Sequence, residues 1–419
     1  MSDFENREFR KKQLKQNMID TGEDKGYEER HVKKSSSGGA AVEYNKKRLL
    51  LLLLIPIFIA GLYWAWKLYS RYSKYTNYTV ISENDITKGS TVGYTEFGNG
   101  ILKYSKDGIV FLDKSGKEVW IESYEMKNPA VVINGDYAVV ADKMGSVLCI
   151  FDKNKKIGEA KTILPITRVA LSSKGVTAVI MEGSGTARIG YFKKTGESID
   201  ISVETILKGD GYPVDLSLSP DGTQLIAAFQ YIEGADMKGR VVFYDFSEKG
   251  KSMKNRVVGG IDEPFASSLI ARVQFTDSTH SYAVADTGIY FFSSKNLLSP
   301  ELVKQEIFDS EAKSICRNKD KVAVILKNHS GESANKLLVY DASGTKLLEK
   351  DFDYDYKYFD MDSGYIFLYN DNSALIYNMY GVEKYKGELD FQVLKCLKGN
   401  APNEFVLIGA AKIKTIRLK

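Results

Sequence analysis

The sequence predicts an all-β fold, an eight-bladed β-propeller with a seven-bladed alternative, preceded by one transmembrane helix and a disordered tail. Three observations lead to this prediction. Short runs of β-branched and aromatic residues recur at a nearly regular interval over residues 91–419, an apolar stretch begins at residue 49, and the first 48 residues are polar and highly charged. With only 3 His and 3 Cys in 419 residues, the chain is neither a multi-zinc protein nor a disulfide scaffold.

Residues 1–48 predict a disordered, basic, cytoplasmic tail. They contain 12 Lys and Arg against 9 Asp and Glu, with few large apolar side chains. Such a segment cannot bury enough apolar surface to fold by itself. The alternative is a short helix between Phe4 and Met18 whose basic side lies on anionic lipid.

Residues 49–69 predict a transmembrane helix that acts as an uncleaved signal-anchor. From Leu49 to Trp66 no side chain is charged, and these 18 residues, at about 1.5 Å each, approach the ~30 Å hydrocarbon core. Aromatic side chains gather at the far end, up to Tyr69, as at a membrane interface. A buried core helix would be shorter and amphipathic, and a cleaved signal peptide would begin nearer the amino terminus. Basic residues at positions 46–48 favour a cytoplasmic amino terminus, so we expect the propeller to lie outside the cell membrane.

Residues 70–90 predict a polar stalk, and residues 91–419 predict the propeller. The most regular runs end at residues 113, 152, 193, 245, 293, 341, 378 and 419. Intervals of 37 to 52 residues fit a blade of four short strands. A second apolar run precedes most of them, as expected for strands buried on both faces. A β-sandwich would not need eight similar units, and a β-solenoid would have a shorter repeat.

The two ends of the propeller region predict how its ring closes. We expect a strand from Thr91–Phe97 or earlier to complete the blade begun at Phe405–Lys419.

Turn dipeptides such as Asp107-Gly108 supply the positive φ angles that tight hairpins need.

Three features could carry chemistry, but each fits a structural role better. Asp351–Asp362 places acids at positions 1, 3, 5 and 12 of an EF-hand-like loop, yet Tyr356 stands where that loop needs Gly, and the alternation predicts an outer strand. The glycine-rich Gly183–Gly190 joins strand to strand and predicts a hairpin turn. The His and Cys residues are scattered without ligand spacing. We therefore predict no metal, no cofactor and no catalytic residue.

A short motif resembles known propellers. Asp113, Gly116 and Trp120 lie in DKSGKEVW, which resembles the Asp-x-x-Thr-Gly-x-x-x-Trp docking repeat of quinoprotein (PQQ-like) propellers, with Ser for Thr and one residue fewer before Gly. The resemblance implies that Trp120 packs between adjacent blades. Ser219–Gly222 is similar to the hairpin turn of WD40-like propellers. As a whole, the chain resembles an uncharacterised family of single-pass, membrane-anchored PQQ-like/WD40-like β-propeller proteins of Gram-positive bacteria.

These patterns predict a non-catalytic binding or scaffold module for a protein or cell-envelope partner. The formal charge of +4 is too balanced for a dedicated nucleic-acid binder. Two alternatives are a quinone-dependent propeller enzyme and an extracytoplasmic sensor that signals through the tail. The enzyme would need several intact Trp repeats, and Trp120 is the only Trp outside the predicted span.

Overall fold

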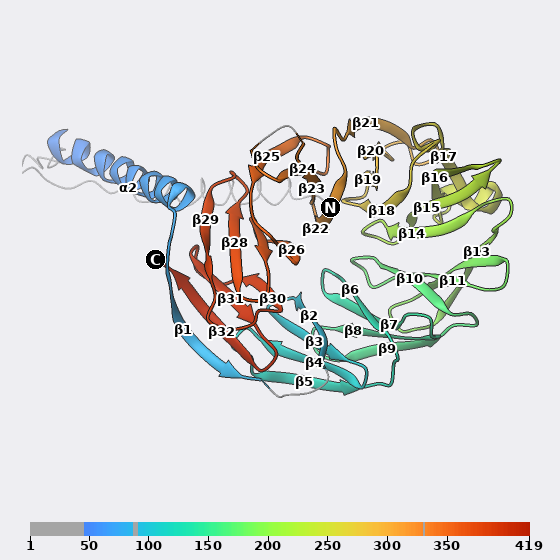
Figure 1. Cartoon of the computed structure of the whole chain (residues 1–419), viewed down its shortest axis with the longest axis horizontal. Coiled ribbons are helices and arrows are strands. Elements are labelled where there is room, and N and C mark those ends of the chain that lie inside the picture. Colours follow the sequence, from blue (N-terminus) through green and yellow to red (C-terminus); the bar gives the residue numbers. More distant parts are fainter. Residues whose placement is uncertain (1–45, 87–90, 330–331) are drawn as a thin grey trace, which may run out of the picture. The chain divides into compact units, whose positions relative to one another are not determined.

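The structure is a computed structural model that describes residues 46–86, 91–329 and 332–419. The chain divides into two compact units, Met1–Tyr63 and Trp64–Lys419. The second unit contains eight four-stranded antiparallel sheets, which are arranged around a common centre in Figure 1. These sheets confirm the all-β, eight-bladed propeller over the seven-bladed alternative.

Within blades 1–7 the strands follow chain order from the centre outward. The strands of blades 1–4 are β2 (Thr91–Phe97), β3 (Gly100–Ser105), β4 (Gly108–Asp113), β5 (Glu118–Ser123), β6 (Pro129–Asn134), β7 (Tyr137–Asp142), β8 (Val147–Asp152), β9 (Lys156–Lys161), β10 (Ile166–Leu171), β11 (Thr177–Glu182), β12 (Thr186–Phe192), β13 (Ser198–Ile206), β14 (Tyr212–Leu218), β15 (Gln224–Glu233), β16 (Asp236–Asp245) and β17 (Val257–Ile261). Those of blades 5–7 are β18 (Ile270–Phe275), β19 (His280–Ala285), β20 (Gly288–Ser293), β21 (Glu301–Ile307), β22 (Ala312–Arg317), β23 (Lys321–Lys327), β24 (Asn335–Asp341), β25 (Lys346–Phe352), β26 (Tyr358–Asp362), β27 (Tyr365–Tyr369), β28 (Ser373–Asn378) and β29 (Glu383–Glu388). Blade 8 comprises β30 (Lys395–Lys398), β31 (Glu404–Ile408), β32 (Lys412–Leu418) and β1 (Tyr78–Asp85), and short 3-10 helices occupy Lys249–Ser252, Lys254–Arg256 and Glu263–Phe265.

The regular runs found in the sequence are the third strands of the blades. Six of the eight predicted end residues close β4, β8, β16, β20, β24 and β28, and the other two lie one residue past β12 and β32. These strands and the second strands are buried on both faces, since apolar residues of adjacent blades pack against each other. The repeat interval was therefore visible because the two middle strands of every blade need continuous apolar sequence.

The ring closes within blade 8, where the first strand of the chain pairs with the last. β1 pairs antiparallel with β32, from Tyr78 opposite Leu418 to Asp85 opposite Lys412. The closing strand therefore lies before Thr91–Phe97, which is the inner strand of blade 1. This corrects the prediction of a stalk over residues 70–90, because the propeller already begins at Tyr78. As an outermost strand, β1 keeps a half-exposed, polar sequence that looks like a linker.

The acidic, aromatic segment that follows β24 is only partly the strand we predicted. Outer strand β25 ends at Phe352, and residues 353–357 lead to β26, the inner strand of blade 7. The predicted alternation of side chains is nevertheless present, since Phe352 is buried whereas Asp351, Asp353 and Asp355 are exposed. The strand is interrupted because the chain must here cross from the rim of one blade to the centre of the next.

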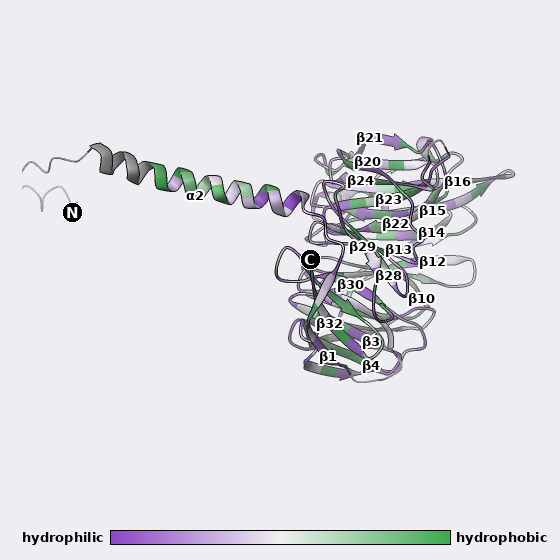
Figure 2. Ribbon diagram, turned by 60° about the vertical axis from the view of Figure 1, so that its left-hand side comes forward, coloured by the Kyte–Doolittle hydropathy of each residue, from purple (hydrophilic) through white to green (hydrophobic). Residues whose placement is uncertain are grey.

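Helix α2 (Lys46–Tyr72) precedes the propeller. From Leu54 to Tyr72 its large apolar side chains are exposed, and Figure 2 shows hydrophilic residues mainly in its last turns. In the described part of the chain, no helix meets the length and apolarity needed to cross a membrane. The side chains of residues 46–53, including Leu49, lie outside the described part, as does the predicted tail up to residue 45.

The closing strand offers a direct test of the ring. Ile413 of β32 is buried between blades 8 and 1, so Ile413→Ala is expected to lower the free energy of unfolding by about 2–4 kcal/mol. Glu118 on outer strand β5 is exposed and away from the closing seam, and Glu118→Ala is the control, with an expected loss under about 1 kcal/mol. Urea unfolding followed by circular dichroism measures both. Equal losses in the two variants would contradict the ring closure described here.

Candidate binding surfaces

The chain joins the propeller on one of its two faces. Buried Lys384 donates from Nζ to the backbone oxygen of Ser70 (3.0 Å), and its own backbone oxygen accepts from the backbone N–H of Tyr75 (3.1 Å). The Arg71 guanidinium lies 3.9 Å from the centre of the Tyr380 ring, in the turn between β28 and β29. Burial lowers the pKa of Lys384. We call this side, formed by the first-to-second and third-to-fourth strand turns, the attachment face.

The opposite side carries a row of exposed apolar side chains, and we call it the apolar face. It consists of the turns between second and third strands and of the links between blades. These turns and links hydrogen-bond to one another: the backbone N–H of Asp286, for example, donates to the backbone oxygen of Leu269 (3.1 Å). On four consecutive blades, 2–5, seven large apolar side chains with exposed fractions of 49–75% lie in these turns and links or at the strand ends next to them. They are Met144, Ile163, Ile206, Ile232, Met237, Leu269 and Ile307.

The apolar row is confined to one part of that face. In the described residues of the matching turns of blades 6, 7, 8 and 1, no large apolar side chain is exposed. Strands β15 and β16 are 10 residues long, and Figure 2 shows their hairpin, which holds Ile232 and Met237, extending past its neighbours. An apolar row backed by a rigid ring is typical of a protein-docking surface.

The motif of Asp113, Gly116 and Trp120 joins blade 1 to both of its neighbours. Asp113 Oδ1 accepts hydrogen bonds from the backbone N–H groups of the turn that follows β4. Gly116 has φ +88°, and a Cβ there would lie 3.1 Å from Ile413 Cδ1 of blade 8. Trp120 stacks on Phe151 of blade 2, with ring centroids 5.8 Å apart. Its Nε1 donates a hydrogen bond to a backbone oxygen that also belongs to blade 2 (2.9 Å). These contacts serve blade packing and leave no group to bind a ligand.

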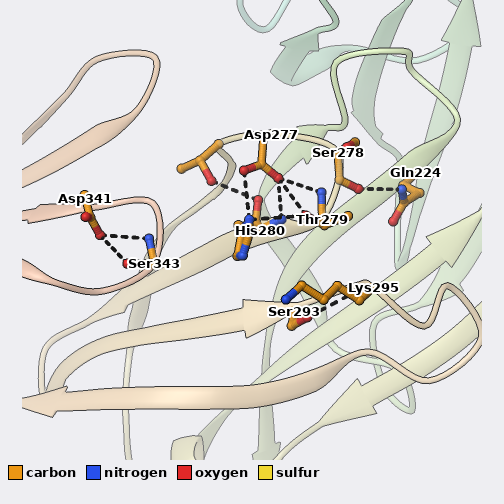
Figure 3. Close-up of polar contacts among 10 residues, drawn as sticks. Gln224, Asp277, Ser278, Thr279, His280, Ser293, Lys295, Asp341 and Ser343 are labelled. Atoms are coloured by element: carbon orange, nitrogen blue, oxygen red, sulfur yellow. Dashed lines mark hydrogen bonds and ion pairs between the residues drawn. The ribbon is translucent and has the colours of Figure 1, made fainter.

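The histidine on the attachment face belongs to a turn. Figure 3 shows Asp277 accepting from the backbone N–H groups of Thr279 and His280, with His280 Nδ1 2.8 Å from Asp277 Oδ2. Gln224 of the preceding blade fixes the same turn through the backbone oxygen of Ser278. In the ranges that the structure describes, no three or more His, Cys, Asp or Glu side chains are grouped to hold a metal ion.

A cavity of about 360 Å³ lies at the innermost strands of blades 1, 6, 7 and 8. Glu96 of β2 and Asp362 of β26 lie side by side in its wall, and burial, followed by the negative charge of Asp362, raises the pKa of Glu96 to about 7. Lys395 of β30 pairs with Asp360 at 2.7 Å. Glu96 can therefore hold a proton near neutral pH. Sequence reasoning missed this pair, because only ring closure brings residues so distant in the chain together.

Eight closed four-stranded blades define the protein as a WD40/PQQ-like β-propeller. The chain belongs to the family of unknown function DUF5711, whose profile matches residues 71–418. This confirms the resemblance to an uncharacterised propeller family, whereas the Gram-positive origin and the membrane anchor remain predictions.

Solved structures show the same fold at low sequence identity. BamB from Moraxella catarrhalis is 15% identical, with a TM-score of 0.50 over 82% of this chain and 100% of its own. Sqt1 from Chaetomium thermophilum, solved bound to the N-terminus of ribosomal protein L10, is 12% identical, with a TM-score of 0.52 over 81% of this chain and 99% of its own. No curated protein matches the sequence. At these identities the likeness concerns the fold alone.

The Glu96–Asp362 pair makes stability depend on pH. Because the folded pKa of Glu96 lies above the ordinary 4.5, its ionisation opposes folding, and stability should fall as the pH rises from about 4.5 to 7. Glu96→Gln is therefore expected to raise the melting temperature at pH 8 and to leave it nearly unchanged at pH 4.5. Glu118→Gln, on exposed outer strand β5, is the control. Parallel pH profiles for wild type and Glu96→Gln would contradict the raised pKa of Glu96.

Proposed function

We propose that the protein is a membrane-anchored, extracytoplasmic propeller that binds a protein or cell-envelope partner without catalysing a reaction. The row of seven exposed apolar side chains on the apolar face carries this proposal. Solvent contact at these positions costs free energy, and a polar residue in a turn would avoid that cost. The similarity in fold to Sqt1, which was solved with a bound peptide segment, fits a binding role.

The residues before the propeller support the membrane anchor. From Leu54 to Tyr72 the large apolar side chains of α2 are exposed, and lipid would cover them. The uncharged stretch continues back to Leu49 in the sequence.

The positive charge of the attachment face also supports the membrane anchor. Its third-to-fourth strand turns hold eleven basic and two acidic side chains. The basic ones are Lys114, Lys117, Lys153, Lys155, Lys193, Lys194, Lys249, Lys251, Lys254, Arg256 and Lys295, and the acidic ones are Glu197 and Glu248. A basic face on the side where the chain enters suits an anionic membrane surface. The apolar face lies on the other side of the ring and is open to a partner.

Photocrosslinking from the apolar face tests the partner. A benzophenone amino acid in place of Ile163 or Ile232 is expected to give discrete adducts in native membranes, because these side chains would lie in the interface. Ile121, equally apolar and 60% exposed on outer strand β5, is the matched control. Identical adducts from Ile121 and Ile163, or none from either apolar-face position, would refute the docking surface.

Cysteine labelling tests the topology. Cys149, Cys316 and Cys396 are free and buried, and burial raises the pKa of Cys149 to about 11, so the wild type should not react with maleimide. In intact cells a membrane-impermeant maleimide is expected to label Asn154→Cys, in an exposed propeller turn. Ser36→Cys, in the tail, should be labelled only after lysis. The reverse pattern would place the propeller in the cytoplasm and overturn this part of the proposal.

A further inference from the structure

A cleft of about 460 Å³ opens between blades 6 and 7, next to the point where the chain enters the ring. Its walls are outer strand β25 of blade 6, outer strand β29 of blade 7 and the residues that follow α2. Tyr72 and Lys74 line it from the side of the entering chain, and Gly381 lines it from the turn between β28 and β29. All of these residues belong to the second compact unit. A cleft of this size is in the range of small-molecule sites.

The entering chain is held firmly at this cleft. Lys384 Nζ is buried and donates to the backbone oxygen of Ser70 (3.0 Å) and to Ser73 Oγ (2.9 Å), so an ammonium group of blade 7 caps the last turn of α2. Asn378 Nδ2 donates to the backbone oxygen of Arg71 (2.8 Å). The cleft is therefore formed before a ligand arrives, which lowers the entropy cost of binding.

Six charged side chains line the cleft, three of each sign, and within the described part of the chain none of them forms an ion pair. The cations are Lys74, Lys350 and Lys386, and the anions are Asp351, Asp353 and Glu383. Lys386 donates only to the backbone oxygen of Asp353 (3.3 Å). Elsewhere on β25 opposite charges do pair, as Lys346 does with Glu349 at 2.7 Å. Charges of both signs that stay apart across a cleft are complementary to a ligand that carries both signs itself.

We propose that this cleft binds a phosphoethanolamine group, whose phosphate contacts the lysines and whose primary ammonium contacts the carboxylates. Hydrogen bonds between ionised groups are the strong ones, and lysine is a common partner of phosphate. A primary ammonium has three N–H donors for carboxylate oxygens, whereas a quaternary ammonium has none. Phosphoethanolamine occurs both as a lipid headgroup and as a free molecule, so the site has two possible sources of ligand.

The position of Tyr72 favours the lipid headgroup. Tyr72 ends α2 and follows Tyr69, the end of the predicted span, by about 5 Å along the helix. The headgroup layer of a bilayer is about 5–7 Å thick on each side, and tyrosine is typical of this depth. The lipid source rests on the proposed membrane anchor, whereas the binding of phosphoethanolamine itself does not.

Calorimetry on the full chain in non-ionic detergent tests the site. Phosphoethanolamine, inorganic phosphate and ethanolamine are titrated in separate arms at constant pH and ionic strength. Saturable one-to-one binding of phosphoethanolamine is expected, about tenfold tighter than either half alone, because only the whole group meets both sets of charges. Absence of saturable binding, or equally tight binding of one half, would overturn the proposal.

Charge variants then assign the binding to the cleft. Lys350→Gln is expected to weaken phosphoethanolamine binding about tenfold, because it removes a charged donor from an exposed position on β25. Lys161→Gln is the matched control, since Lys161 is exposed on outer strand β9 of blade 2 and has no ion pair in the described structure. Equal effects of the two substitutions would show general screening of charge and refute the site.

A carboxylate variant separates the two halves of the ligand. Glu383→Gln is expected to weaken phosphoethanolamine binding but to leave inorganic phosphate binding unchanged or tighter, because only the ammonium half loses its partner. A purely structural role of Glu383 would weaken both ligands equally and contradict the assignment. Asp353→Asn makes the same test if the first variant does not fold.

Native mass spectrometry distinguishes the two sources of ligand. The full chain is reconstituted in vesicles of equal phosphatidylethanolamine and phosphatidylcholine, extracted and weighed with the lipids that it retains. Retention of phosphatidylethanolamine, lost in Lys350→Gln, is the expected result, and equal retention of both lipids would refute the headgroup site. Binding of free phosphoethanolamine without retained lipid would assign the cleft to a soluble ligand, and the cysteine labelling above then tests the anchor separately.

Discussion

The pairing of β1 with β32 is the contact on which the rest of the propeller depends. Each blade buries an apolar face against the next, so an open ring would leave two such faces in water. The cluster between blades 1 and 8 includes Ile101 and Leu112 from one end of the chain and Ile408 and Ile413 from the other. Ring closure also brings Glu96 beside Asp362, where burial and the neighbouring negative charge raise the pKa of Glu96 to about 7.

The burial of apolar strands between blades also decides how much of the fold could be predicted from the sequence. Second and third strands are buried on both faces, so they must be continuously apolar, and their repeat gives eight units directly. Outermost strands face water on one side and lose that signal, which is why β1 resembles a linker. Residues 353–357 keep the alternating pattern of a strand but belong to neither β25 nor β26, because a strand also needs a neighbouring segment to pair with along its length.

The central cavity was less accessible to sequence reasoning, because innermost strands from different blades create it. Glu96 and Asp362 each stand alone in an ordinary strand sequence, and only the radial arrangement makes them neighbours. A usable signal does exist, since a charged residue within the first strand of a blade must face the centre of the ring or be paired. The docking motif around Trp120 was visible because its residues are close in the sequence.

The two faces of the ring differ in a way that folding does not require. Turns of a propeller need glycine, asparagine or aspartate to reverse the chain, and the attachment face uses these residues with lysine between them. On the apolar face, turns, links and the adjoining strand ends of four successive blades hold isoleucine, leucine and methionine, where each exposed side chain opposes solubility without adding to the core. A rigid closed ring holds those side chains at fixed spacing, so a partner meets a surface that is already ordered and loses little entropy in ordering it. Under the proposed function, the stability of the ring and the apolar row both contribute to the presentation of a fixed binding surface.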